Sequence, residues 1–268
     1  MVSSFSIFET TMKAAAILVA AGSSTRMGFD KLTAPLAGQP LLYWSLQAVQ
    51  DCAEISMAIL VCAPQRTEEF AALAKSFPKI SRVVAGGAER SASVLNGLLA
   101  LAPNPPDLIA VHDAARPLAT PALFTQVLAA AEKHRAASAA HPVADSLHRA
   151  NAAGLLHETL SRQTLFAMET PQAAAFPELL AAIREHGAGA TDEVGALIAA
   201  GIHPVPVVHG VPNFKITHTA DLPVAEEILK PAKPDDPSRQ ASALARRRSL
   251  LRRLDHFSAH PRLSRRAV

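Results

Sequence analysis

The sequence predicts an α/β domain built on a mostly parallel sheet with helices on both faces. Short apolar runs typical of buried strands alternate with amphipathic stretches typical of helices through most of the 268 residues. The first four expected strands are Ala14–Ala20, Met57–Cys62, Arg82–Val84 and Leu108–His112. Because right-handed crossovers connect parallel strands, the loops that follow these strands should meet at one edge of the sheet.

Helices are expected between these strands, near Leu41–Asp51, Thr67–Phe77 and Arg90–Leu101. Pro40 is suited to the first turn of the first of them. Thr120 followed by Pro121 forms an N-cap and first-turn pair, which predicts a further helix after the fourth strand.

Regular patterning lapses between about His141 and Met168. Weak alternation and an Asn-Ala-Ala-Gly turn predict a hairpin or a protruding arm there. The pattern then resumes. We expect helices at Pro177–His186, Thr191–Ala200 and Ala220–Leu229, and short strands at Val205–Val208 and Phe214–Thr217.

The two ends of the chain are expected to lie outside this domain, which should span residues 13–230. Residues 1–12 precede the first strand as an extension, and residues 231–268 form a Pro-rich linker and a basic tail. The tail holds ten Lys/Arg and three Asp/Glu, which leaves 16 basic and 20 acidic residues in the remainder. The pI near 9.1 therefore does not indicate a nucleic-acid-binding body. We expect a disordered tail, the alternative being a basic amphipathic helix.

Composition points to a cytoplasmic protein without a membrane partner. No apolar run reaches the roughly 18 residues that cross a bilayer, and the first residues lack the pattern of a signal peptide. Cys52 and Cys62 are the only cysteines, and we expect two buried, unpaired thiols in a reducing compartment.

The most informative segment is the loop after the first strand, AAGSSTRMGFDK. Gly22 and Gly28 let backbone amides approach an anion, and Arg26 and Lys31 add two positive charges. This arrangement predicts a negatively charged ligand at the carboxyl end of the strand. The loop has neither the Gly-Lys-Ser/Thr ending of a Walker loop nor the GxGxxG of dinucleotide folds.

Other polar segments should lie at the same edge, each with a plainer alternative. Asp113 ends a strand and suits a Mg²⁺ ligand or a ribose contact, or else forms a helix cap or an ion pair with Arg116. The run Thr191–Glu193 either contributes to the site or caps a helix. Lys215 is either a site residue or a solvated lysine on an edge strand.

Taken in order, the segments AAGSSTRMG, GGAERSAS, HDAARP, DS, TPQ, TDE and NFKIT resemble those of the 2-C-methyl-D-erythritol 4-phosphate cytidylyltransferase family. The resemblance covers about Lys13 to Lys230. It implies a Rossmann-like, doubly wound fold of the nucleotide-diphospho-sugar transferase type, with an arm that exchanges between the subunits of a homodimer. The implied reaction transfers CMP from CTP to methylerythritol phosphate with Mg²⁺ or another divalent cation as cofactor, and releases pyrophosphate.

The resemblance also implies the roles of individual residues. The implied catalytic residues are Arg26, Lys31, Arg162 and Lys215. The implied CTP-binding residues are Ala21, Gly22, Arg26, Lys31, Gly87, Ser93 and Asp113, of which Asp113 also binds the metal. The implied substrate-binding residues are Arg116, Ser146, Arg162, Thr170, Thr191 and Lys215. Ser146 and Arg162, which lie on the arm, would serve the neighbouring subunit's site.

Two alternatives remain open. A ribitol 5-phosphate cytidylyltransferase would share the fold, the motifs and CTP, and would differ in its polyol pocket. A non-catalytic nucleotide sensor or nucleic-acid-binding protein is suggested by the Arg-rich tail. The presence of Arg26, Lys31, Asp113 and Lys215 argues against lost catalysis, and the acidic body argues against an extended nucleic-acid surface.

Overall fold

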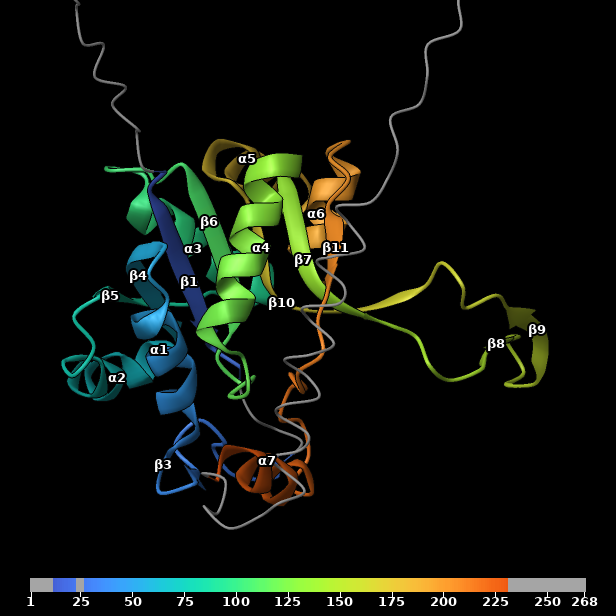
Figure 1. Cartoon of the computed structure of the whole chain (residues 1–268), viewed down its shortest axis with the longest axis horizontal. Coiled ribbons are helices and arrows are strands. Elements are labelled where there is room, and N and C mark those ends of the chain that lie inside the picture. The colour runs from blue at the N-terminus through green and yellow to red at the C-terminus, as the bar shows by residue number, and fades with distance from the viewer. Residues whose placement is uncertain (1–11, 23–26, 231–268) are drawn as a thin grey trace, which may run out of the picture. The chain divides into compact units, whose positions relative to one another are not determined.

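The computed structural model describes residues 12–22 and 27–230 (Figure 1). The extension before Met12, Arg26 and the tail from residue 231 onward lie outside the described residues. The described residues up to Ile228 belong to one unit, which is the unit considered below.

A seven-stranded sheet forms the centre of this unit, with the strand order β11-β7-β10-β6-β1-β4-β5. In that order the strands are β11 (Val205–Val208), β7 (Ala136–Pro142), β10 (Phe166–Ala175), β6 (Leu108–Asp113), β1 (Ala14–Ala20), β4 (Ile55–Cys62) and β5 (Ile80–Ala85). Neighbours pair in parallel except at β10, which runs antiparallel to both β6 and β7. The predicted mostly parallel α/β fold is confirmed.

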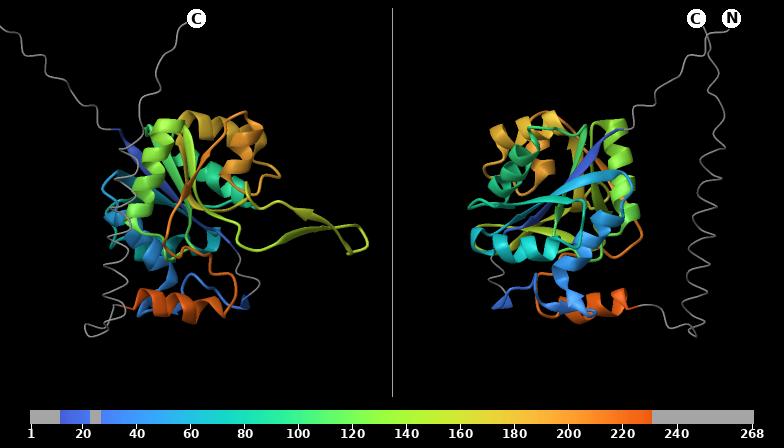
Figure 2. Two further views of the ribbon diagram at one scale, coloured as in Figure 1. Left: turned by 45° about the vertical axis from the view of Figure 1, so that its right-hand side comes forward. Right: turned by 90° about the vertical axis from the view of Figure 1, so that its left-hand side faces the viewer.

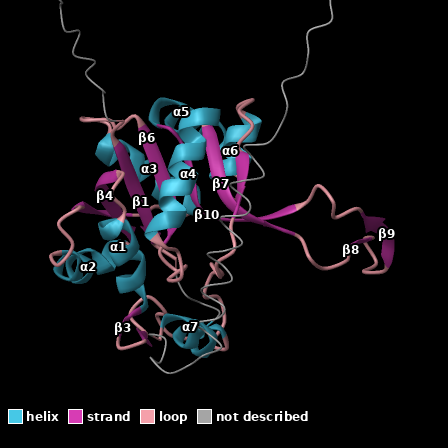
Figure 3. Cartoon of the chain, viewed as in Figure 1, coloured by secondary structure: helices cyan, strands magenta, loops and turns pink. Residues whose placement is uncertain are grey.

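Helices cover both faces of the sheet (Figures 2 and 3). The helices are α1 (Leu41–Asp51), α2 (Thr67–Ala74), α3 (Arg90–Leu101), α4 (Pro121–His134), α5 (Phe176–His186), α6 (Glu193–Ala199) and α7 (Asp221–Leu229), and a 3₁₀ turn spans Pro64–Arg66. Helices α1 and α4 lie on one face, and α3, α5 and α6 lie on the other. The predicted cap of α4 is confirmed, since the Thr120 hydroxyl accepts the Leu123 N–H at 3.3 Å. Pro40 precedes α1 as its N-cap rather than entering its first turn.

The core consists mainly of aliphatic side chains on the central strands. Ala15, Ala16, Ile17 and Leu18 of β1 have no exposed surface, because β4 and β6 flank the strand and helices cover it. A strand buried on both faces is continuously apolar instead of alternating, as β1 is. Both cysteines are buried and unpaired, as expected.

The segment between β7 and β10 is a protruding hairpin (Figure 1). Strands β8 (Leu147–Ala150) and β9 (Leu156–Leu160) pair antiparallel. The turn between them is closed by the Asn151 side chain, which accepts the N–H groups of Ala153 and Leu155 at 3.0 Å each. The hairpin interpretation of this region is therefore correct.

Two features differ from the sequence-based expectations. Strands β7 and β10 were not expected, and their pairing forms the root of the arm. The segment Phe214–Thr217 is not a strand. Its backbone N–H bond to the body runs from Ile216 to the Ala115 carbonyl at 2.8 Å, and its Lys215 side chain reaches Asp113 at the end of β6. The remaining short pair is β2 (Pro35–Leu36) with β3 (Gln39–Pro40).

Candidate active site

A pocket of about 360 Å³ opens at the carboxyl ends of β1 and β6, where the parallel topology brings the predicted loops together. Ala21 and Gly22 contribute to its wall from the end of β1, and Asp113 contributes from the end of β6. The loop before α3 and the segment around Lys215 complete the wall. The predicted site residues that line the pocket are Ala21, Gly22, Lys31, Gly87, Ser93, Asp113 and Lys215.

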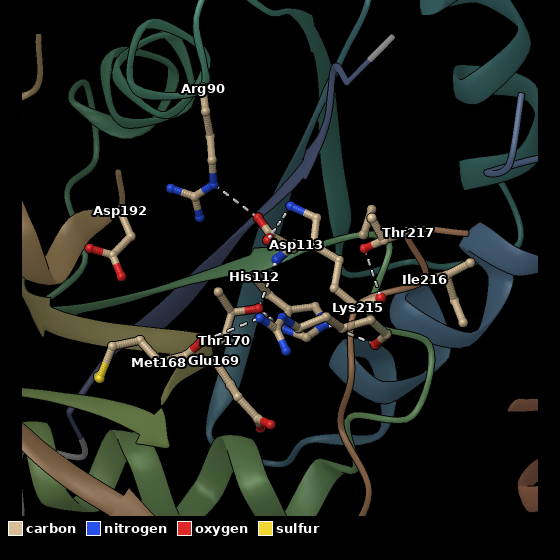
Figure 4. A network of polar contacts seen from close by, with 12 residues as sticks. Arg90, His112, Asp113, Met168, Glu169, Thr170, Asp192, Lys215, Ile216 and Thr217 are labelled. Atoms are coloured by element: carbon tan, nitrogen blue, oxygen red, sulfur yellow. Dashed lines mark hydrogen bonds and ion pairs between the residues drawn. The ribbon is translucent and has the colours of Figure 1, made fainter. Parts of the chain in front are cut away.

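Asp113 is the electrostatic centre of the pocket (Figure 4). Its Oδ1 lies 3.0 Å from Nε of Arg90, and its Oδ2 lies 2.8 Å from Nζ of Lys215. Burial by itself would raise the pKa of Asp113, but the charges of Arg90 and Lys215 outweigh burial and hold that pKa well below its usual range. Asp113 is therefore ionised, and its ion pairs are with these two cations instead of with Arg116.

Arg90 is fixed by a second carboxylate. At the first position of α3, its Nη1 and Nη2 donate to the two oxygens of Glu193 at 2.6 and 3.0 Å. Burial would lower the pKa of Arg90, but Glu193 and Asp113 together raise it, so the guanidinium stays charged. The planar fork of arginine suits this bidentate contact.

Glu193 opens α6, and the residue before it supports the predicted capping alternative. The Asp192 side chain accepts the Gly195 N–H at 2.9 Å as the N-cap. Gln172 of β10 donates to Asp192 at 2.9 Å and accepts the Val194 N–H at 3.0 Å. Gln172 thus binds the residues on both sides of Glu193. These contacts fix the start of α6 so that the Glu193 side chain faces Arg90.

The loop after β1 delivers Lys31 to the same pocket. Nζ of Lys31 donates to the Ile216 carbonyl at 2.8 Å, so the lysine reaches the segment that carries Lys215. Gly28 has a φ of +70°, a left-handed conformation that favours glycine. Asp30 accepts the Leu32 N–H at 3.1 Å and also forms an ion pair with Arg66.

Glycine is required in the loop before α3, because this loop approaches the end of β1 closely. A Cβ at Gly86 would lie 2.6 Å from Cβ of Ala21. Ser93 fixes the same loop, since its hydroxyl accepts the Gly87 N–H at 3.1 Å and donates to the Glu89 carbonyl at 3.0 Å. Ser93 thus shapes the loop as well as lining the pocket.

Thr170 and His112 lie behind Asp113. The Thr170 hydroxyl accepts the Asp113 N–H at 3.0 Å and lies 3.0 Å from Nδ1 of His112. Nε2 of His112 lies 3.2 Å from the Arg116 carbonyl, which can only accept, so Nε2 is assigned the proton. Burial lowers the pKa of His112 to about 4. His112 is therefore a neutral, structural residue at pH 7.

The structure does not bring every predicted residue to the pocket. Arg116 donates instead to the carbonyls of Asn213 and Met168, at 2.7 and 3.4 Å. Thr191 is exposed beside the Asp192 cap. Ser146 and Arg162 lie on the exposed arm, where Arg162 contacts the Ala144 carbonyl, and neither lines the pocket.

Three polar residues received no assigned role in the site: Arg90 and Glu193 were considered only within the GGAERSAS and Thr191–Glu193 segments, and Glu169 was not considered. Arg90 and Glu193 carry an ion pair that spans 103 positions of the chain, and Glu169 binds side chains from β7 and from the segment after β11. The position of Arg90 at a helix N-terminus, inside GGAERSAS, was the available signal for one of them. Glu169 had no local signal, because nothing in ETPQ distinguishes a buried glutamate from an exposed one.

The fold and the pocket together define the class of protein to which the chain belongs. An anion-binding pocket of glycine loops and converging cations, at the carboxyl edge of a parallel sheet, is characteristic of α/β proteins that bind nucleotides and other phosphorylated ligands.

The comparisons with known proteins narrow this class to one family. Residues 14–231 match the family model of 2-C-methyl-D-erythritol 4-phosphate cytidylyltransferase. A protein of that name from Cereibacter sphaeroides is 41% identical over 221 residues, covering 81% of this chain and 97% of the relative. Another from Nitrosomonas eutropha is 40% identical over 227 residues, covering 82% and 97%.

Solved structures agree with the sequence relatives. The 4-diphosphocytidyl-2C-methyl-D-erythritol synthase of Anaerococcus prevotii superposes with a TM-score of 0.72 at 26% identity, covering 82% of this chain and 96% of that one. The cytidylyltransferase of Thermus thermophilus gives a TM-score of 0.65 at 28% identity, with 79% and 96% covered. The chain belongs to the 2-C-methyl-D-erythritol 4-phosphate cytidylyltransferase family and is a nucleotidyltransferase, as its ordered motifs predicted.

Proposed function

We propose that the pocket around Asp113 is the active site in which this cytidylyltransferase transfers the cytidylyl group of CTP to 2-C-methyl-D-erythritol 4-phosphate. The observation that carries the assignment is the convergence of Lys31, Lys215 and Arg90 from three separate segments on one pocket. Converging cations that Asp113 and Glu193 hold in place suit a reaction between two phosphate groups, where positioning and charge neutralisation dominate.

The proposed chemistry needs no general base. A phosphate oxygen of the methylerythritol phosphate, largely dianionic at pH 7, attacks the α-phosphorus of CTP. A new P–O bond forms, the bond from the α-phosphorus to the bridging oxygen breaks, and pyrophosphate leaves with the electron pair. Lys31 and Lys215, together with Arg26, would stabilise the charge that develops on the α-phosphate.

The glycine loops suit the nucleotide end of this reaction. Ala21, Gly22, Gly87 and Ser93 line the pocket with small side chains or none. They would bind the cytidine. Thr170, which touches the Asp113 backbone, would lie toward the polyol phosphate, and Arg116 and Thr191 would support that side.

Asp113 fits a Mg²⁺ ion that is held mainly by the nucleotide. Mg²⁺ commonly takes one or two protein carboxylates and completes its octahedron with phosphate oxygens and water. Asp113 supplies one such carboxylate on the pocket wall, and its low pKa keeps it ionised. When bound, the ion would neutralise phosphate charge, and Arg90 and Lys215 would hold the Asp113 carboxylate in place for it.

We further propose a homodimer with exchanged arms, located in the cytoplasm. Ser146 and Arg162 lie on a hairpin that leaves the body, and an isolated hairpin is marginal in water without a packing partner. Arg162 would bind the polyol phosphate in the partner's pocket. Among the described residues, no helix is long and apolar enough to cross a membrane.

The test is an assay of pyrophosphate release by the purified full chain with CTP, Mg²⁺ and methylerythritol phosphate. The same assay with ribitol 5-phosphate examines the nearest alternative substrate, and Asp113→Asn serves as a variant of the same shape without the charge. We expect turnover with methylerythritol phosphate and little with ribitol 5-phosphate. Turnover with ribitol 5-phosphate alone would overturn the substrate assignment, and activity retained by Asp113→Asn would overturn the pocket.

A further inference from the structure

A buried carboxylate outside the pocket binds three side chains from two segments, β7 and the segment after β11. Glu169 of β10 has a side chain that is 7% exposed. Its Oε1 lies 3.0 Å from Nδ1 of His141, at the end of β7. Its Oε2 lies 2.8 Å from Nε2 of His209 and accepts the Asn213 amide N–H at 2.8 Å. Both oxygens are therefore engaged.

The backbone of Glu169 is fixed as firmly as its side chain. Its carbonyl accepts the Ser138 hydroxyl at 3.2 Å and the Gln172 amide at 3.0 Å. Burial would raise the pKa of Glu169, but the hydrogen bonds from His209 and Asn213 and the charge of Arg116 lower it. An ionised carboxylate that accepts several charge-assisted bonds in a buried site is a strong anchor.

Asn213 connects Glu169 to the active site. The Asn213 amide that binds Glu169 also donates to the Thr170 carbonyl at 2.9 Å, and the Asn213 carbonyl accepts Nη1 of Arg116 at 2.7 Å. Asn213 is thus held at both its side chain and its backbone. Two residues later, Lys215 reaches Asp113.

His209 holds the other end of the same segment. It follows β11 directly and is 5% exposed. The segment from His209 to Thr217 forms no strand, so side-chain contacts hold it, together with the bonds of the Ile216 backbone to Ala115 and Lys31. Figure 4 shows Glu169 below Thr170, pointing away from Asp113, so Glu169 has no direct access to the reacting groups.

We propose that Glu169 is a positioning residue that fixes the segment from His209 to Thr217 so that Lys215 meets Asp113. The proposal rests on the proposed function for its kinetic readout. The cluster also lies at the root of the arm, where His141 pairs with Ala167 across β7 and β10, so the carboxylate ties that root to the lysine-bearing segment.

A double-mutant cycle between Glu169 and Lys215 tests this inference. Glu169→Ala should lower kcat about 10–100-fold with little change in the KM for CTP, since misplacing a catalytic group by about 1 Å can cost about 100-fold. In the Lys215→Ala background the same substitution should cost less than about threefold, because its effect passes through Lys215. Glu169→Gln, which keeps the shape, should retain more activity than Glu169→Ala.

Glu178→Gln is the control, because Glu178 is likewise a carboxylate engaged by a basic side chain, that of Arg135, but lies on α5 away from the pocket. It should leave kcat unchanged. Equal losses from Glu169→Ala in the two backgrounds would show a general structural effect and overturn the proposal. The proposal would be equally wrong if neither Glu169 variant folded, as judged by circular dichroism.

A measurement that does not depend on catalysis tests the positioning role of Glu169 separately from the proposed reaction. Reductive methylation of Lys215, followed by mass spectrometry and compared with the exposed Lys75, should be faster in Glu169→Gln and Glu169→Ala than in the parent chain. An unchanged ratio of Lys215 to Lys75 modification would overturn the positioning role even if the enzyme is active. A changed ratio would support it even if the substrate were a different polyol phosphate.

Discussion

Nζ of Lys215 lies 2.8 Å from Oδ2 of Asp113, although 102 positions separate the two residues in the chain. The second oxygen of Asp113 contacts Arg90, so one carboxylate orients two cations that come from different parts of the fold. Asp113 therefore fixes the orientation of both cations in the pocket. Preorganised charge of this kind stabilises a transition state without reorganisation at the moment of reaction.

The lysines should matter for rate more than for binding. We expect Lys31→Ala and Lys215→Ala each to lower kcat by about 10²–10³ with a smaller effect on the KM for CTP, the range typical of losing one preorganised stabiliser. Arg26→Ala should behave in the same way. Steady-state kinetics of pyrophosphate release give both constants. Lys79→Ala, which removes a lysine bound to the Cys52 carbonyl, is the control and should be close to neutral. A normal kcat with only a raised KM would contradict this, because it would mean that the side chain stabilises the bound substrate and the transition state equally.

The buried pair of Arg90 and Glu193 should be costly to break. Glu193 is 1% exposed at its side chain, so Arg90→Met would leave Glu193 buried without its partner and Asp113 with Lys215 alone. We expect the free energy of unfolding to fall by about 3–5 kcal/mol in urea denaturation. The double variant Arg90→Met/Glu193→Met should recover part of the loss.

Arg149 provides the control for that experiment, because it forms an ion pair with Glu158 on the exposed arm at 2.8 Å. Arg149→Met should change the unfolding free energy by less than about 1 kcal/mol, as exposed pairs do. Equal effects of Arg90→Met and Arg149→Met would contradict the importance of burial.

The regular part of the fold could be predicted because its signals are local. The apolar run of β1 and the Thr120 cap of α4 each carry their own signature. Strand β7 escaped prediction because AASAAHP lacks the β-branched and aromatic residues typical of strands. Strand β10 was missed because its pairing with β7 shifts register between Met168 and Gln172, which interrupts any regular alternation.

The site was predictable to the extent that loops after parallel strands meet at one edge. That rule predicted that Lys31, Asp113 and Lys215 lie together at this edge. The partners that fix them could not be found in this way. Glu193 and Glu169 act across the sheet, and their burial depends on how β10 and α6 pack, which no short segment encodes.

His112 should make stability depend on pH. Its pKa is lowered by burial to about 4, against about 6.5 in the unfolded chain, so between these values the unfolded state binds more protons. This contribution to stability is fully present above about pH 6.5 and is lost as the pH falls toward 4. From pH 7 to pH 5 it should amount to about 2 kcal/mol.

The measurement is urea denaturation at both pH values for the parent chain, His112→Gln and His134→Gln. The pH-dependent loss should be smaller in His112→Gln, and unchanged in His134→Gln, since His134 is exposed at the end of α4. An identical pH dependence in all three proteins would contradict a neutral buried His112.

The arm gives the sharpest test of the proposed homodimer. Ser146 and Arg162 lie outside the pocket of their own chain, and the proposal places them in the partner's pocket. Lys31→Ala and Arg162→Ala should each be nearly inactive alone. In a mixed dimer one site would carry both defects and the other neither, since Lys31 serves its own pocket and Arg162 the partner's. Mixing equal amounts with free subunit exchange should therefore restore about a quarter of the parent activity, because about half the dimers are mixed and each has one intact site.

The control is Lys31→Ala mixed with Lys215→Ala, two defects in the same pocket, which leaves every site impaired and should recover nothing. If Arg162 instead served its own chain, the Lys31→Ala and Arg162→Ala mixture would also stay inactive despite exchange, and each active site would be complete within a single subunit.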